Sequence, residues 1–280
     1  MVLDGAINVL TNNGTITGSV LKQDVLTETA LSTLATSVDP SVTGHTDVFN
    51  NYLMTGNIQT ASNTTITFEN NGALFAGATL NLGSSTSRLT NNGIFASAAS
   101  SSLRTISTTN INGSFVQNAG ALTLVRVDSP ENGMDQFVVT GNADFLGGYL
   151  KPVPLDRSFI APGTVTQNIF QTGGTLNFVN PDLIILDESI IMSYVASANS
   201  SGISLAATAN FAPAGMSTYS TQVGNSIGSM QTAGSSPFFG AVTSRLVSTQ
   251  STVSQLDQTY TALAGTAISA VPQVNYEAVN

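Results

Sequence analysis

The sequence predicts a mainly β chain folded as a right-handed parallel β-helix, a solenoid with about 20 residues in each rung. Three observations support this fold class. An Asn-Gly pair recurs at a nearly constant spacing, short strand-like segments lie between the copies, and the polar side chains are mostly Ser, Thr, Asn and Gln instead of charged residues. A β-rich cap and a short helical tail are expected at the C-terminal end.

The spacing of the repeat sets the expected period of the fold. Copies of the pair stand at Asn71-Gly72, Asn92-Gly93, Asn112-Gly113 and Asn132-Gly133, and an earlier copy is Asn12-Asn13-Gly14. The four later copies are 20 or 21 residues apart. Hairpin turns of an antiparallel sandwich would recur about every 8 to 12 residues, roughly half of that spacing. The period therefore favours solenoid rungs, each of which buries its apolar side against its neighbours.

The composition limits the kinds of partner that the chain can have. Only 8% of the residues are charged, while 41% are hydrophobic, which is enough to build a core. The formal net charge is −9, and the seven basic residues are scattered from Lys22 to Arg245. No basic patch is available, so binding to nucleic acid or to an anionic membrane surface is not expected. Cysteine is absent, so stability must come from packing and ladder hydrogen bonds.

The N-terminal residues do not resemble a targeting segment. Met1 is not followed by a signal peptide, and no apolar run is long enough to span a bilayer. The start Met1-Val2-Leu3-Asp4 looks artificial. We therefore expect a mature fragment from which an export signal has been removed.

Three regions are predicted along the chain. Residues 1–130 form a β-helical stalk, residues 131–209 form the cap, and residues 210–280 form a helical linker. A short helical insertion is expected at residues 24–39, where apolar residues recur every four positions. The linker has apolar residues at helical spacing, and Pro272 is predicted to end that pattern.

Grouped carboxylates are the first candidates for catalysis, because β-helical glycosidases and lyases use clustered acids. One cluster contains Asp128, Glu131, Asp135 and Asp144, and a second contains Asp182, Asp187 and Glu188. Only Arg126 lies near the first cluster as a base for lyase chemistry. Solvated loop carboxylates explain both clusters more simply, so no catalytic residue is assigned.

His45 is the only histidine, and Asp47 follows two residues later. A Gly-x-Ser-x-Gly elbow is absent, so His45 is better explained as a turn residue than as the base of a catalytic triad. One histidine and no cysteine exclude an ordinary zinc site, and the spaced acidic patterns of calcium loops are absent. We therefore expect neither an enzyme nor a cofactor nor a metal site.

The segment Asp135–Gly148, DQFVVTGNADFLGG, carries the most specific pattern. An Asp opens a strand, and a Thr-Gly-x-Ala-x-apolar-x-Gly-Gly turn follows. This segment resembles the start of the autochaperone-like C-terminal part of bacterial autotransporter passengers. The strands up to about Thr208 resemble the rest of that cap, and the segments Gln255–Gln258 and Ala267–Ala278 resemble the helical linker before the membrane barrel. The resemblance covers roughly residues 60 to 280.

The resemblance implies a non-enzymatic passenger segment on the cell surface of a Gram-negative bacterium, exported by type V secretion. Such a segment folds vectorially during translocation across the outer membrane and then acts as a display stalk. The implied partners are its own outer-membrane β-barrel, which these residues lack, and the barrel-assembly machinery. One alternative is an adhesin that binds a glycan or host ligand or associates with itself. A β-helical polysaccharide-degrading enzyme is the other.

The residues assigned to a site are therefore structural, at turns and in the cap. They are Asn71, Gly72, Asn92, Gly93, Asn112, Gly113, Asp135, Gly141, Gly147 and Gly148.

Overall fold

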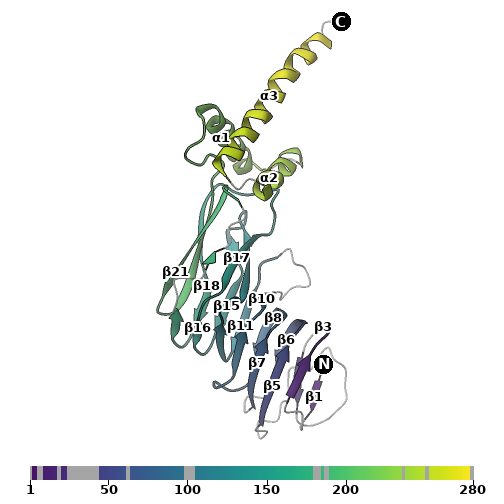
Figure 1. Cartoon of the computed structure of the whole chain (residues 1–280), viewed down its shortest axis with the longest axis vertical. Coiled ribbons are helices and arrows are strands. Elements are labelled where there is room, and N and C mark those ends of the chain that lie inside the picture. The colour runs from purple at the N-terminus through teal and green to yellow at the C-terminus, as the bar shows by residue number, and fades with distance from the viewer. Residues whose placement is uncertain are drawn as a thin grey trace.

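The computed structural model describes residues 2–4, 9–17, 20–23, 44–60, 64–97, 105–178, 184–185, 189–234, 237–249 and 252–277. These residues form an elongated β body with three helices at one end (Figure 1). The N-terminus lies at the far end of the body, and helix α3 projects away from the opposite end. The prediction of a mainly β chain with helices near its C-terminus is confirmed.

The elements follow one another in a regular order. The strands are β1 Val2–Asp4, β2 Val9–Asn12, β3 Thr15–Thr17, β4 Val20–Gln23, β5 Gly44–Asn50, β6 Leu53–Gln59, β7 Thr64–Asn70, β8 Ala73–Asn81, β9 Arg88–Asn91, β10 Ile94–Ser97, β11 Thr108–Asn112, β12 Ser114–Gln117, β13 Leu122–Asp128, β14 Gly133–Met134, β15 Gln136–Val139, β16 Ala143–Phe145, β17 Tyr149–Pro154, β18 Gly163–Thr172, β19 Leu176–Phe178, β20 Ile184–Ile185, β21 Met192–Asn199 and β22 Gly202–Ala209. The helices are α1 Thr218–Thr232, α2 Pro237–Thr249 and α3 Val253–Glu277.

Seven strands form a small sheet in which neighbouring strands are parallel. The order is β2-β5-β7-β9-β12-β16-β19, which is also their order along the chain. We call one small-sheet strand, with the chain up to the next one, a pass. Asn50 and Asn70 are paired across 20 residues, and Asn70 and Asn91 across 21. These separations match the spacing of the predicted repeat.

The large sheet has 15 strands, and the chain enters it after each small-sheet strand. Its first lane joins β3, β6, β8, β10, β13, β17 and β20 in parallel. Its second lane joins β8, β11, β15 and β18, also in parallel. Strand β8 belongs to both lanes, because its start pairs with β10 and its end pairs with β11. The prediction of parallel sheets, in which strands of successive passes pair, is therefore confirmed.

Alternate side chains of the strands point inward and meet in one core. In β7 the alternation is strict, since Ile66 and Phe68 are buried while Thr65, Thr67 and Glu69 between and beside them are partly exposed. This period of two is what a strand requires when one face is packed and the other faces solvent.

Phenylalanines concentrate in the C-terminal half of the core. The ring centroid of Phe170 lies 5.5 Å from that of Phe115, 4.7 Å from that of Phe137 and 4.9 Å from that of Phe145. All four side chains are at most 2% exposed. Each such pair adds about 0.5–1.5 kcal/mol beyond simple burial. The cluster joins residues on both sides of the predicted boundary at residue 130 into one core.

Parallel pairing gives way to antiparallel pairing at β18. Strand β22 pairs antiparallel with β18, and β21 pairs antiparallel with β22. These strands extend the sheet beyond the second lane, so the sheet ends on this side at β21 and not at β18. The change in pairing falls within the predicted cap, residues 131–209.

The helices pack on the capped end of the β body (Figure 1). Leu246 of α2 and Leu256 and Tyr260 of α3 are buried in the same core cluster as Phe211, which follows β22. The prediction that Pro272 ends the helical pattern is wrong, because α3 continues to Glu277. An interior proline costs a helix roughly 3 kcal/mol, mainly through a lost backbone hydrogen bond, but it does not always end the helix.

Two further predictions concern helices: the absence of a membrane-spanning segment and the helical insertion at residues 24–39. Of the helices described, none combines the length and the apolar character needed to cross a membrane. The predicted helical insertion at residues 24–39 lies outside the described residues.

Candidate functional site

A ladder of buried asparagines lines the corner where each pass leaves the small sheet. The Nδ2 of Asn12 donates to Oδ1 of Asn50 at 2.8 Å, Asn50 donates to Asn70 at 2.7 Å, and Asn70 donates to Asn91 at 2.8 Å. We call this set the inner ladder. Each of the first three amides also donates to a backbone carbonyl of the next pass, so both of its hydrogens are bonded. The inner ladder therefore satisfies buried amides that would otherwise be costly.

A second ladder of asparagines runs beside the first on the outside of the corner. Asn51 donates to Asn13 at 2.9 Å, Asn71 to Asn51 at 3.0 Å, Asn92 to Asn71 at 2.8 Å and Asn118 to Asn92 at 2.6 Å. We call this set the outer ladder. Its amides donate toward the N-terminal end, whereas the inner amides donate toward the C-terminal end.

The predicted turn residues Asn71 and Asn92 belong to the outer ladder, and the glycines after them allow the passes to stack. A Cβ on Gly72 would lie 2.2 Å from the backbone oxygen of Tyr52, and a Cβ on Gly93 would lie 2.1 Å from the backbone oxygen of Gly72. Neither contact is sterically allowed. The structure thus brings these four predicted residues together at one corner.

The remaining predicted turn residues lie at other corners. Asn112 donates to Oδ1 of Asn81 at 2.9 Å and precedes Gly113, which joins β11 to β12. Gly141 stacks on Gly113, because its backbone nitrogen donates to the Gly113 carbonyl at 2.9 Å. These positions form a second glycine-containing corner, separate from the asparagine ladders.

Gly147 and Gly148 turn the chain from β16 into β17. Gly148 has a φ of +94°, and a Cβ there would lie 2.5 Å from the backbone oxygen of Ala121. A side chain at Gly148 is therefore disfavoured both by the left-handed backbone and by the close approach of the preceding pass.

The inner asparagines are structural residues of this corner that were not among the predicted turn residues. Asn50, Asn70 and Asn91 each precede an outer-ladder asparagine, so the available signal was an Asn-Asn pair and not the Asn-Gly pair. The inner ladder ends at Gln117, which occupies the next position in register and accepts a hydrogen bond from the Thr123 hydroxyl.

Asp135 forms a buried ion pair with Arg126. The Nε of Arg126 donates to Oδ2 of Asp135 at 2.8 Å, and its Nη2 donates to Oδ1 at 2.9 Å. The backbone nitrogens of Arg126 and Ser107 donate to the same carboxylate at 2.9 and 2.8 Å. Desolvation raises the pKa of Asp135 above its usual 3.8, against the lowering effect of Arg126 and of the two backbone donors. The pair joins the start of β15 to β13.

The structure does not bring the acidic candidates into one site. Asp135 is fully buried in its ion pair, and Asp128 accepts the backbone N–H of Glu131 in the turn after β13. Asp144 lies on β16 of the small sheet, whereas Asp128 belongs to the large sheet. The second acidic cluster, Asp182, Asp187 and Glu188, lies outside the described residues.

His45 lies on β5 in the small sheet, on a solvent-facing side. Its Nε2 is 2.9 Å from Oδ1 of Asp47 and 3.4 Å from Oγ1 of Thr67. His45 is thus a strand residue and not a turn residue as predicted, because Gly44 and the residues after it pair with β7. Within the described chain, no three His, Asp or Glu side chains are grouped to hold a metal ion.

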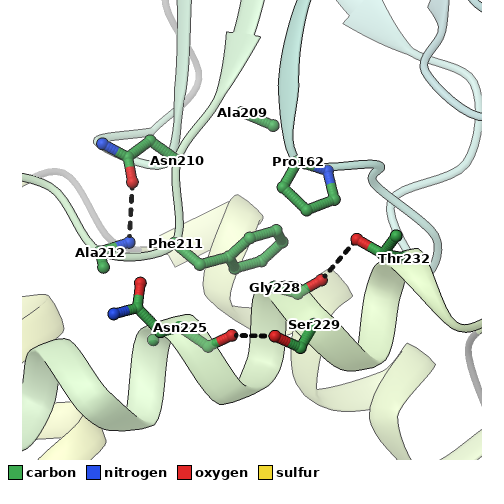
Figure 2. A pocket seen from close by; sticks show the side chains of 10 residues that line it. Pro162, Ala209, Asn210, Phe211, Ala212, Asn225, Gly228, Ser229 and Thr232 are labelled. Carbon is green, nitrogen blue, oxygen red and sulfur yellow. Dashed lines mark hydrogen bonds between the residues drawn. The ribbon is translucent and has the colours of Figure 1, made fainter.

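A groove of about 370 Å³ lies between the cap and α1 (Figure 2). Its walls include Pro162 and Phe211 from the β side and Asn225, Ser229 and Thr232 from α1. The Ser229 hydroxyl donates to the backbone oxygen of Asn225 at 2.9 Å, and that of Thr232 donates to Gly228 at 3.2 Å. The lining residues carry no charge, so the groove lacks an acid or base for catalysis.

Hydrogen bonds hold the helices on the cap. The Tyr260 hydroxyl donates to the Phe211 carbonyl at 2.9 Å, and burial raises the pKa of Tyr260 above its usual 10.0. Ser217, the N-cap of α1, donates from its backbone nitrogen and its hydroxyl to Oδ1 of Asp257 at 2.8 and 2.9 Å. These bonds from Ser217, the backbone one foremost, lower the pKa of Asp257.

Comparisons of the chain with protein-family models, with curated proteins and with solved structures found no match. A function must therefore be inferred from the chemical groups at the described sites. These groups are amides, hydroxyls and apolar side chains in repeated rows, together with the buried ion pair of Arg126 with Asp135.

Proposed function

We propose that the passes form a right-handed parallel β-helix and that the chain is a non-enzymatic display stalk on the cell surface of a Gram-negative bacterium. In this proposal the chain is the C-terminal passenger segment of an autotransporter and is exported by type V secretion. The observation that supports it best is the distinct C-terminal end, where antiparallel β22 and β21 extend the sheet beyond β18 and buried residues of the helices join the same core.

A well-packed C-terminal end suits a chain that is exported C-terminal part first. Each pass contacts only its neighbours, so a solenoid can grow by adding passes to a folded end. The aromatic cluster around Phe170 and the ion pair of Arg126 with Asp135 lie near the cap, which makes that end the stronger template. Folding outside the membrane then biases the chain against sliding back.

The helices are the proposed connection to a membrane barrel. Helix α3 leaves the body at the end opposite the N-terminus, as Figure 1 shows. A barrel joined after α3, assembled by the barrel-assembly machinery, would hold the stalk with its first passes farthest from the membrane. The buried Tyr260 fixes the start of α3 on the cap.

The order of folding tests the template mechanism on the whole chain. The chain is refolded from denaturant, pulse-labelled by hydrogen exchange and analysed by peptide mass spectrometry. We expect peptides of β17, β18 and β22 to become protected before those of β5 and β7. Earlier protection of β5 and β7 would contradict a C-terminal template.

Export tests the proposed location. The chain is placed between a signal peptide and an autotransporter barrel in a Gram-negative host, and its surface exposure is measured by protease digestion of intact cells. Gly148→Val should reduce display strongly, because its side chain would meet the Ala121 carbonyl. Gly120→Val, at a corner with the same left-handed backbone but open space, is the matched control. Equal display of both variants would contradict a role of the cap in export.

A further inference from the structure

A long uncharged face runs beside the corner at which the small sheet joins the large one. We define the amide–apolar face by two rows of side chains. The first row is the outer ladder from Asn51 to Asn118. The second row consists of outward-facing residues in register on successive strands of the first lane, namely Leu53, Ala73, Ile94, Leu122 and Tyr149.

The apolar row of this face is partly open to solvent, since Leu53, Ala73 and Leu122 are half-buried. Ile94 is 37% exposed and Tyr149 is 36% exposed, although the residues next to them along each strand, Phe95 and Leu150, are buried. Tyr52, at the corner between the two rows, is 59% exposed. The next two passes carry Gly72 and Gly93 at this corner, so no side chain separates the amides from the apolar row there.

The outer amides are able to bind a ligand while keeping the ladder. Each of Asn71 and Asn92 uses one amide hydrogen to reach the oxygen of the preceding asparagine, and the side chains are exposed. An amide has two hydrogens and an oxygen with two lone pairs. One donor and one acceptor position of each exposed side chain are therefore not used by the ladder.

This face differs from the outer side of the small sheet in its charged residues. The two rows and Tyr52 contain no ionisable acid or base apart from tyrosine, whereas His45, Asp47, Glu69, Arg88 and Asp144 lie on small-sheet strands. The two rows contain no cation, and Lys151 beside them, two residues after Tyr149 on β17, is a single positive charge on a chain of net charge −9, so an acidic polymer is not attracted. The face complements a neutral ligand with apolar patches and hydroxyl groups.

We propose that the amide–apolar face binds a neutral linear polysaccharide lying along the axis of the β body. The C–H faces of the sugar rings pack on Ile94, Leu122 and the two tyrosines, and the sugar hydroxyls bond to the outer amides. One amide and one apolar side chain recur at each strand spacing of about 4.8 Å, which fits a repeating polymer better than a single sugar. This binding does not depend on the proposed export role.

Affinity electrophoresis of the full chain tests the proposal, with β-glucan, mannan or galactomannan in the gel and polygalacturonate as the acidic comparison. We expect at least one neutral polysaccharide to retard the chain. Ile94→Asp should weaken binding at least about tenfold, because it buries a charge against an apolar sugar face. Asn71→Ala with Asn92→Ala should weaken it similarly by removing the amides. Thr67→Asp, outward-facing on the small sheet beside Arg88, should leave binding unchanged.

Several outcomes would overturn the proposal. Retardation by none of the neutral polysaccharides would do so, as would equal retardation of the Ile94→Asp variant and the unmodified chain. Stronger retardation by polygalacturonate would contradict a neutral ligand. Sedimentation velocity distinguishes another occupant: a dimer that Ile94→Asp dissociates, without glycan binding, would assign the face to a second copy of the chain.

Discussion

Asn70 is fully buried, and its side-chain amide donates to Oδ1 of Asn91 on the next pass at 2.8 Å. The same oxygen-to-nitrogen contact recurs between Asn50 and Asn70 at 2.7 Å. A polar row inside a protein is tolerated only when its groups are bonded, and here each amide supplies the partner of the next. Stacked amide ladders of this kind also stabilise cross-β assemblies.

Replacing Asn70 therefore affects two neighbouring passes. Asn70→Ala should lower the free energy of unfolding by roughly 2–4 kcal/mol, because it leaves the amide of Asn50 and the carbonyl of Ile94 without a buried partner. Asn71→Ala removes an exposed amide of the outer ladder and should cost less than about 1 kcal/mol. Denaturant unfolding followed by circular dichroism measures both. Equal losses in the free energy of unfolding would show that a buried ladder asparagine contributes no more than an exposed one.

The ion pair of Arg126 with Asp135 predicts a loss that depends on pH. Arg126→Met should destabilise the chain by roughly 3–5 kcal/mol at neutral pH, because a buried carboxylate loses its cation. The pKa of Asp135, already raised by burial, then rises further in the folded state. A raised carboxyl pKa means that the folded state binds a proton more readily than the unfolded one, so the loss should shrink as the pH falls toward 3.8.

The double variant Arg126→Met with Asp135→Asn provides the control for that pH dependence. The double variant lacks the carboxyl group. Its loss in the free energy of unfolding, relative to the unmodified chain, should therefore not shrink as the pH falls. Denaturant titrations at several pH values give both curves. A loss in Arg126→Met that stays constant with pH would mean that Asp135 is not left as a buried charge.

Gly120 and Gly148 both have a left-handed backbone, but only Gly148 is also in close contact with a neighbouring pass. Substituting each one distinguishes the cost of backbone strain from the cost of steric contact. Gly120 has a φ of +85° with open space around it, whereas Gly148 has a φ of +94° and faces the Ala121 carbonyl. Gly120→Ala should cost about 1–2 kcal/mol for the backbone conformation alone. Gly148→Ala should cost about 1–3 kcal/mol more, because the neighbouring pass must also move. Thermal or denaturant unfolding that ranks the two variants equally would contradict the close approach.

The aromatic cluster predicts which substitutions slow folding. Phe170→Leu should slow refolding of the full chain, because Phe170 joins Phe115, Phe137 and Phe145 in the proposed template. Ile66→Val, in an early pass, should mainly speed unfolding. Stopped-flow fluorescence or circular dichroism gives both rates, with an expected change of about 1 kcal/mol for each variant. The reverse pattern would place the folding nucleus at the N-terminal end.

Alkaline pH should loosen the helices from the cap. The pKa of Tyr260 is raised by burial, so the folded state keeps the phenol protonated while the unfolded chain loses the proton above about pH 10. The stabilisation by Tyr260 is complete below that pH, and it should fall by about 1.4 kcal/mol for each further pH unit. Tyr260→Phe should be less stable at pH 8 by about 1 kcal/mol through the lost bond to Phe211, but less sensitive to alkali. Parallel alkaline profiles of the two proteins would exclude this role.

The period of the fold was predictable, and the reason lies in the residues of one corner. Asn71 and Asn92 are spaced by one pass, and Gly72 and Gly93 are required there by backbone contact. Asn112 continued the spacing in the sequence but lies at a different corner. The pass after Asn91 is longer, since Asn91 pairs with Gln117 and not with a residue near 112. A fixed period cannot reveal a pass that lengthens.

Other features depended on contacts that the sequence pattern does not encode. Arg126 and Asp135 are brought together because β13 and β14 form an antiparallel hairpin. The apolar outer row was equally hidden, because Ile94 and Tyr149 align only when the register between β10, β13 and β17 is known. Helix α2 contains Gly240 and was predicted only as part of a helical region, since glycine weakens the local signal.

The opposite directions of the two asparagine ladders have an electrostatic consequence. In an α-helix the peptide dipoles point the same way and sum to partial charges of about half an elementary charge at its two ends. The inner amides direct their oxygens toward the N-terminal end, whereas the outer amides direct theirs toward the C-terminal end. The two rows of dipoles therefore oppose each other over the passes in which both ladders run, from Asn12 to Asn92. A body of this design is able to lengthen by many passes without accumulating a field at either end.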